Sequence, residues 1–171
     1  MSDSKSDALM VTVDTDLSAE KSDSIQTIYY PASMFRVSPQ DDLMQFHRVL
    51  RGGGILIVQT YLAPTKKHRP IYLEALQSAL QGRRVRLSNE YEWVRWVKAA
   101  SFETTKQEKH DLLIEIEMID IPPERIEKAR ILLHQCPSDL LEFVAPIFPP
   151  QGRLGYVVRQ LEMILQKPNA I

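Results

Sequence analysis

The sequence predicts an α/β domain in which a mostly parallel central sheet is flanked by helices. Strand-like and helix-like segments alternate through the first two thirds of the 171 residues, the order expected of a truncated Rossmann-like sheet with crossover helices. The segment Ile55–Val58 is apolar at every position, which is typical of a strand buried on both faces of a parallel sheet. Ser38-Pro39, followed by Asp41 and Asp42, is typical of a helix N-terminus.

The first 60 residues divide into a tail and three regular elements. Residues 1–24 carry six acids and two lysines and predict a flexible acidic tail, in which the alternating segment Ala8–Val13 could form a short strand. Ile25–Tyr30 is β-branched and aromatic and ends at a proline, so it predicts a strand. A helix follows from Pro39, and we expect Arg51–Gly54 to terminate it before a buried strand begins at residue 55.

Four more helices and a final strand are predicted from periodicity and from proline and glycine positions. We expect a helix from Pro70 to Gly82, a helix from Asn89 to Ala100, a helix opened by Pro122-Pro123, a short helix over 138–144 and a final strand over 155–165. Residues 102–106 and 111–119 predict two separate extended segments. The regular part therefore spans residues 25–168 as one domain.

Composition excludes several classes of protein. Lys and Arg number 21 against 22 Asp and Glu, for a net charge of −1, so the chain as a whole is not a polybasic nucleic-acid tail. One cysteine, Cys136, excludes an internal disulfide and a multi-cysteine zinc site, and the four scattered histidines predict no metal site. No apolar run approaches the about 20 residues that cross a bilayer, and the start lacks a secretory pattern. We therefore expect a soluble cytoplasmic protein without a membrane partner.

The order of elements resembles a known family. A strand ending in Tyr29-Tyr30, a helix, and then His47–Val58 (HRVLRGGGILIV) resemble the fourth strand, the following helix and the fifth strand of class I S-adenosylmethionine-dependent methyltransferases, with Gly52 at the proline of the family's RVLRPGG phrase. Trp93–Thr105 is similar to the family's LLKAAGFEVV segment, with Ser101 at its glycine. The resemblance covers about residues 25–168 and implies a truncated methyltransferase-like fold.

The glycine-rich cofactor loop of that family is absent from the sequence. The six glycines all lie at or after Gly52, downstream of where the loop would be, so the resemblance implies the second half of the fold without its first strand and loop. It also implies candidate cofactor-binding positions. An acidic residue of Val11–Ser18, similar to the family's VDLS phrase, would hold the ribose, and residues after the fourth strand would face the methyl donor. These candidates are Asp14, Asp16, Tyr29, Tyr30 and Ser33; the alternative for the tyrosines is packing on a neighbouring helix.

A basic stretch is the second candidate site. Residues 65–109 hold ten basic side chains against five glutamates, and they include Tyr91, Trp93 and Trp96, which could stack on bases. The two tryptophans stand three apart, as in a helix core, so we favour a solvated helix face with paired charges over a nucleic-acid site. The basic candidates are Arg83, Arg84, Arg86, Arg95 and Lys98.

Three functional hypotheses follow. The first is a methyltransferase-like protein that is non-catalytic on its own and acts as a binding, assembly or regulatory subunit, with no cofactor in the isolated chain and with homo- or hetero-oligomers formed through an exposed sheet edge or apolar surface. The second is an active methyltransferase that uses S-adenosylmethionine and is either completed by a partner chain or built around an unusual cofactor loop from residues 8–24. The third is a nucleic-acid-binding module. No catalytic residue is predicted, and a strand and turn before residue 25 beside Tyr29-Tyr30 would complete a pocket there.

Overall fold

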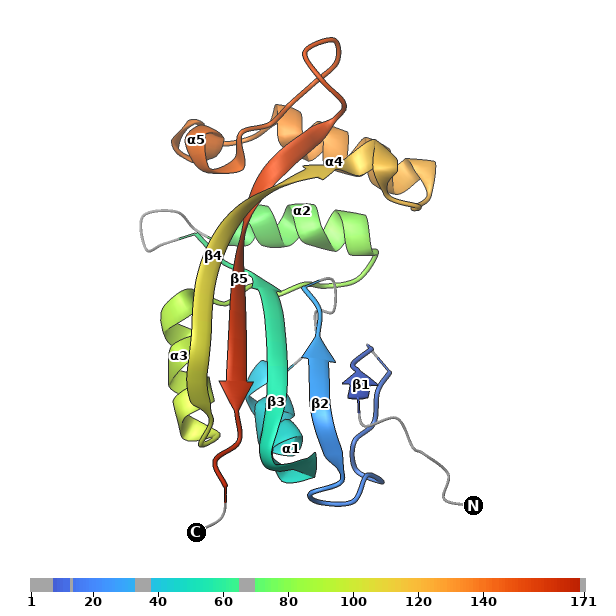
Figure 1. Cartoon of the computed structure of the whole chain (residues 1–171). Coiled ribbons are helices and arrows are strands. Elements are labelled where there is room, and N and C mark those ends of the chain that lie inside the picture. The colour runs from blue at the N-terminus through green and yellow to red at the C-terminus, as the bar shows by residue number, and fades with distance from the viewer. Residues whose placement is uncertain (1–7, 13, 33–37, 65–69, 170–171) are drawn as a thin grey trace. The chain divides into compact units, whose positions relative to one another are not determined.

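A computed structural model of the chain describes residues 8–12, 14–32, 38–64 and 70–169 (Figure 1). Its five strands form one sheet in the order β1-β2-β3-β5-β4, and the predicted α/β class is confirmed. The elements are β1 (Ala8–Met10), β2 (Ile25–Tyr30), α1 (Pro39–Val49), β3 (Leu50–Tyr61), α2 (Ile71–Gln81), α3 (Glu90–Ala99), β4 (Glu103–Glu115), a 3-10 turn (Ile116–Met118), α4 (Pro123–His134), a second 3-10 turn (Ser138–Leu140), α5 (Leu141–Val144) and β5 (Gly155–Gln166).

The chain divides into two compact units, each described here by itself. Unit 1 comprises Met1–Thr60, Glu90–Lys109 and Leu161–Ile171, and unit 2 comprises Tyr61–Asn89 and His110–Gln160. None of the described helices is long and apolar enough to cross a membrane.

In unit 1 the strands β1, β2 and β3 are parallel neighbours, and α1 and α3 pack against each other on one face of them (Figure 1). Strand β5 is antiparallel to β3 (Figure 1). The two strands are joined by hydrogen bonds from the Gly53 N–H to the Lys167 carbonyl (2.9 Å) and from the Lys167 N–H to the Gly54 carbonyl (3.0 Å). The predicted parallel order thus holds for β1–β3. A short strand does precede β2, although it is only three residues long.

The glycine run is part of a strand, which corrects the prediction that Arg51–Gly54 terminates the helix and that the strand begins only at residue 55. Helix α1 ends at Val49, the backbone is already extended at Leu50, and β3 begins there. Gly53 has a φ of +74°, and a Cβ on Gly54 would lie 2.8 Å from the Arg51 carbonyl oxygen. The glycines therefore let the chain bend sharply and pass close to its own backbone as it enters the sheet.

Strand β4 is continuous, where the sequence predicted two segments, 102–106 and 111–119. It lies at the edge of the sheet, and its residues from Glu103 to Asp111 are all exposed. An edge strand needs no apolar pattern, and charged side chains along it discourage pairing with another chain. The polar residues 107–110 therefore hide the strand from a periodicity analysis, and residues 116–118 of the second segment form a 3-10 turn instead.

Unit 2 is held by the packing of α2 on α4 and by buried polar pairs. Gln77 of α2 donates from Nε2 to the Tyr156 hydroxyl at 2.6 Å, and both side chains are buried. Helix α2 ends at Gly82, whose φ of +67° forms the left-handed cap that the sequence predicted. The guanidinium of Arg125 from α4 lies against this glycine and donates to the Gln81 carbonyl at 3.4 Å.

Candidate functional site

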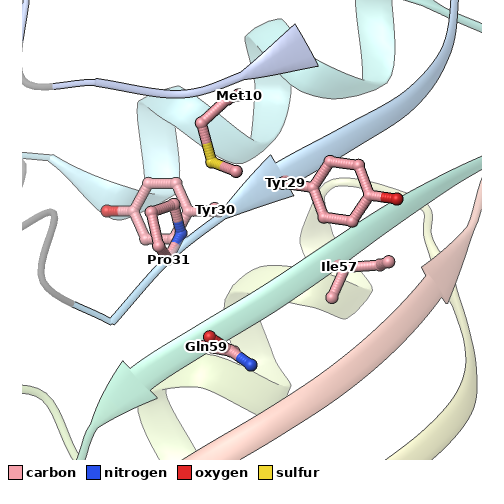
Figure 2. A pocket seen from close by; sticks show the side chains of 6 residues that line it. All are labelled: Met10, Tyr29, Tyr30, Pro31, Ile57 and Gln59. Atoms are coloured by element: carbon pink, nitrogen blue, oxygen red, sulfur yellow. The ribbon is translucent and has the colours of Figure 1, made fainter. Parts of the chain in front are cut away.

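A row of three side chains crosses the strands β1, β2 and β3 of unit 1. The register places Met10 beside Tyr29 and Tyr29 beside Ile57, so their side chains share one face of the sheet. With Tyr30, Pro31 and Gln59 they line a hollow of about 160 Å³ (Figure 2). It lies where β1 and β2 end, and the carboxyl ends of parallel strands are where open α/β sheets bind ligands.

The two tyrosines that the sequence singled out, Tyr29 and Tyr30, point to opposite faces of the sheet. Tyr30 is buried and meets Phe46 of α1 and Trp93 of α3 edge-on, with ring centroids 5.7 and 6.2 Å away. Tyr29 points to the opposite face and is 39% exposed. Tyr30 therefore packs on the helices, which is the alternative that the sequence offered for these residues. Tyr29 lies on the pocket side of the strand (Figure 2).

Gln59, at the rim of the hollow, begins a chain of polar contacts that runs toward β5 and β4. Gln59 donates from Nε2 to the Glu162 carboxylate at 3.0 Å. The Lys106 ammonium lies 3.8 Å from the same carboxylate and 3.0 Å from that of Glu108. These contacts place Gln59, Glu162 and Lys106 on the same face as Tyr29, with the charges at one end of it.

The hollow is small, and its described lining is uncharged. Its described lining offers phenol, amide and thioether groups, and none of the lining residues is charged. Its volume is below the roughly 300–1,000 Å³ that encloses a small-molecule ligand. S-adenosylmethionine carries a ribose diol, an amino-acid head and a sulfonium charge, and the described lining supplies no carboxylate for them. The described lining of this hollow thus does not by itself fit the whole cofactor.

The acidic candidates lie in the loop between β1 and β2 and do not line the hollow. Asp16 accepts hydrogen bonds from the Ser18 N–H and hydroxyl, both at 2.9 Å, and Asp14 is exposed. Arg48 of α1 holds this loop through the carbonyl oxygens of Leu17 (2.5 Å) and Glu20 (2.7 Å). The Asp16 carboxylate therefore already closes a local turn. Ser33 lies outside the described residues.

The basic candidates are divided between the units. Arg83, Arg84 and Arg86 follow α2 in unit 2, whereas Arg95 and Lys98 lie exposed on α3 in unit 1. Of the aromatic residues among them, Tyr91 is 74% exposed and Trp93 only 2%. Trp96 packs edge-on against Trp93 at 5.6 Å. The tryptophan spacing thus marks the core side of α3, and Trp93 is not available to stack on a base.

A charged cluster ties the C-terminal end of β5 to the start of β2. Lys167 donates to the Asp23 carboxylate at 2.8 Å and to the Leu50 carbonyl at 2.7 Å, and the hydrogen bond from Lys167 holds the pKa of Asp23 below its usual range.

His47 packs edge-on against the Phe102 ring, with 5.2 Å between the ring centroids. Burial lowers the pKa of His47, the Lys167 charge lowers it further, and Asp23 opposes both. Among the described residues no His, Cys, Asp and Glu side chains gather into a metal site.

Met10, Pro31, Ile57 and Gln59 are the pocket residues that the sequence did not single out. A signal for Met10 was present, because in the alternating segment Ala8–Val13 it stands out of phase with Leu9 and Val11 and so on the other face. Ile57 and Gln59 could be found only from the register that sets them beside β2.

Comparison with known proteins finds solved structures of similar fold. No family model matches the chain, and no curated protein matches its sequence. BH2331, a proposed methyltransferase from Bacillus halodurans, superposes with a TM-score of 0.76 at 13% identity, over 91% of this chain and 70% of that one. The YcgJ protein from Bacillus subtilis gives 0.74 at 16% identity, over 89% and 68%.

A third structure contains a partner protein. It is a complex of the Haloferax volcanii methyltransferase activator Trm112 with a proposed methyltransferase, similar with a TM-score of 0.50 at 14% identity, over 93% of this chain and 60% of that one. The chain therefore has a methyltransferase-like fold, as residues 25–168 led us to expect, and it lacks a counterpart to about a third of the length of such proteins.

Proposed function

We propose that this chain is a methyltransferase-like protein that does not transfer methyl groups on its own and acts as a binding or assembly subunit. The observation that carries the proposal is the hollow at Tyr29, which is small, uncharged in its described lining and open to one face of the sheet. The absence of a glycine-rich loop from the sequence supports it, because that loop is the usual source of close backbone contacts to the cofactor.

Isothermal titration of the purified chain with S-adenosylmethionine tests this proposal. We expect no stoichiometric heat at cofactor concentrations up to about 1 mM, which would place any Kd outside the range of ordinary enzyme–substrate affinities. Stoichiometric binding in the micromolar range would contradict the proposal, most clearly if Tyr29→Ala abolished it.

An active enzyme completed by a partner is the second candidate function. It is favoured by the Haloferax volcanii structure, in which a protein of similar fold is paired with an activator. In that case S-adenosylmethionine would bind only to the chain in complex, and Asp14→Ala or Asp16→Ala would weaken binding there if either carboxylate holds the ribose. Native mass spectrometry of the protein purified from its own source would distinguish the two candidates by a retained nucleoside together with a partner chain.

A further inference from the structure

We propose that Met118 is a site of oxidation to methionine sulfoxide, at which Arg153 directs the incoming oxygen to one side of the sulfur atom. Met118 is 65% exposed at the end of the first 3-10 turn, Ile116–Met118. The Arg153 guanidinium donates from Nη1 to the Met118 Sδ at 2.9 Å. The oxidant is a peroxide, and both residues belong to unit 2.

The backbone brings these two side chains together. The Ile116 N–H, at the start of the turn, donates to the Leu154 carbonyl at 2.8 Å, so the turn lies beside the segment that leads into β5. Glu115 holds the guanidinium from the side of the turn, with its Oε2 atom 3.5 Å from Nη1 of Arg153. Main-chain pairing and an ion pair therefore fix the approach of Arg153 to the Met118 sulfur.

The hydrogen bond from Arg153 makes the two sides of the sulfur unequal. A thioether sulfur has two lone pairs, and oxygen transfer to one or the other gives the two epimers of the sulfoxide, whose sulfur is chiral. The Arg153 N–H occupies one lone pair of Met118, whereas the exposure of the side chain leaves the other open to solvent. We therefore expect oxygen to arrive mainly on the open side and one epimer to predominate.

The step is a two-electron oxygen transfer from a peroxide, with hydrogen peroxide as the simplest case. The open lone pair of Met118 attacks one peroxide oxygen, so that an S–O bond forms and the O–O bond breaks. The leaving hydroxide takes the proton of the transferred hydroxyl group, and the products are the sulfoxide and water. Sulfur is oxidised and the peroxide is reduced. The side chain becomes polar at a place where Met118 and Ile119, which is 38% exposed, form an apolar surface.

Met10 and Met44 are the matched methionines of the same chain. They are 58% and 53% exposed, and none of the described residues donates a hydrogen bond to either sulfur. Peroxide reaches exposed sulfur atoms first, so we expect all three methionines to be oxidised well before Met163, which is fully buried. The ratio of the two epimers should distinguish Met118 from the two reference methionines.

Limited oxidation of the full chain with hydrogen peroxide, followed by trypsin digestion and mass spectrometry, measures this ratio. Cleavage after Lys and Arg places Met10, Met44 and Met118 in separate peptides with one methionine each, residues 6–21, 37–48 and 110–125. Each digest is then treated, in the presence of a dithiol reductant, with one of the two stereospecific methionine sulfoxide reductases, which remove opposite epimers. The fraction reduced by each enzyme gives the ratio.

We expect one epimer to exceed the other by about threefold or more at Met118, because attack on the occupied side must first displace a hydrogen bond. In Arg153→Leu the ratio should fall to that of the two reference methionines. Arg130→Leu is the matched control and should leave the ratio unchanged, since it removes another ion-paired arginine of unit 2, whose side chain is 48% exposed against 54% for Arg153. A nearly equal mixture at Met118 in the unaltered chain, the same ratio in Arg153→Leu, equal changes in both arginine variants, or oxidation of Met118 no faster than that of Met163 would overturn the proposal.

Discussion

Replacing Tyr156 by phenylalanine removes one oxygen atom from the core of unit 2. Tyr156 is fully buried on β5, and its hydroxyl accepts a hydrogen bond of 2.6 Å from the amide of Gln77, which is itself 2% exposed. Burial raises the pKa of the Tyr156 phenol, so the hydroxyl stays neutral across the stable range of the protein. The ring of phenylalanine fills almost the same space, so the change tests the polar pair rather than the packing.

The cost follows from the donor that loses its partner. A buried hydrogen-bond donor without an acceptor costs about 1–3 kcal/mol, more than the net value of about 1 kcal/mol of an ordinary hydrogen bond. We expect Tyr156→Phe to lower the free energy of unfolding by about 2 kcal/mol, which corresponds to about 4–8 °C in Tm at this chain length. Gln77→Leu removes the stranded amide as well, so the double variant should lose less than the sum of the single losses, with a coupling of about 1 kcal/mol.

Urea denaturation followed by circular dichroism measures these differences. Tyr91→Phe is the matched control, because it removes the same atom from a side chain that is 74% exposed and should change stability by less than about 0.5 kcal/mol. Equal losses in Tyr156→Phe and Tyr91→Phe, or strictly additive losses in the double variant, would refute the reasoning.

Two further predictions concern the ends of helices. Gly82→Ala is expected to lower the free energy of unfolding by about 1–2 kcal/mol in urea denaturation, because alanine disfavours the left-handed backbone at φ +67°. The Arg125 guanidinium that its Cβ would meet is the end of a flexible side chain and can move away, so the loss should be about the same in an Arg125→Ala background, and a loss that vanished there would contradict the backbone argument. The lowered pKa of His47 means that below about pH 6.5 the unfolded chain binds a proton that the folded chain does not, so the free energy of unfolding should fall between pH 7 and pH 5. His47→Gln should flatten this slope, and an NMR titration of the ring at or above the ordinary pKa would rule the effect out.

Local signals predicted the elements whose ends are set by single residues. Pro31 ends β2, Pro39 opens α1 and Gly82 caps α2, and each of these effects depends on one residue's backbone geometry. Strand β4 was predicted in two pieces because an exposed edge selects for charge rather than for alternation. The glycine run was predicted to end the helix, because a glycine-rich helix end and a glycine-rich start of a strand look the same in a local sequence.

The site was only half predictable for a related reason. The two tyrosines were found because they end a strand, and the end of a parallel strand is a common place for ligands. Met10 and Ile57 join them through the register of three strands, because Met10 pairs with Tyr29 and Tyr29 pairs with Ile57, residues that are far apart in the sequence. A single sequence does not display such pairing. The acidic candidates were matched on a four-residue phrase, and the carboxylate of Asp16 is engaged in a local turn.

One disagreement between sequence and structure bears on function. The continuous apolar run Ile55–Val58 predicts a strand covered on both faces. Of its four residues only Leu56 and Val58 are fully buried, and Ile55 and Ile57 are half-buried on the face away from α1 and α3. A strand with one face in solvent usually carries polar residues at such half-buried positions, as β3 does at Gln59. Isoleucine at both positions is instead the composition typical of a strand that is covered on both faces. The sequence of β3 thus predicts apolar cover on a face to which no described helix of unit 1 contributes.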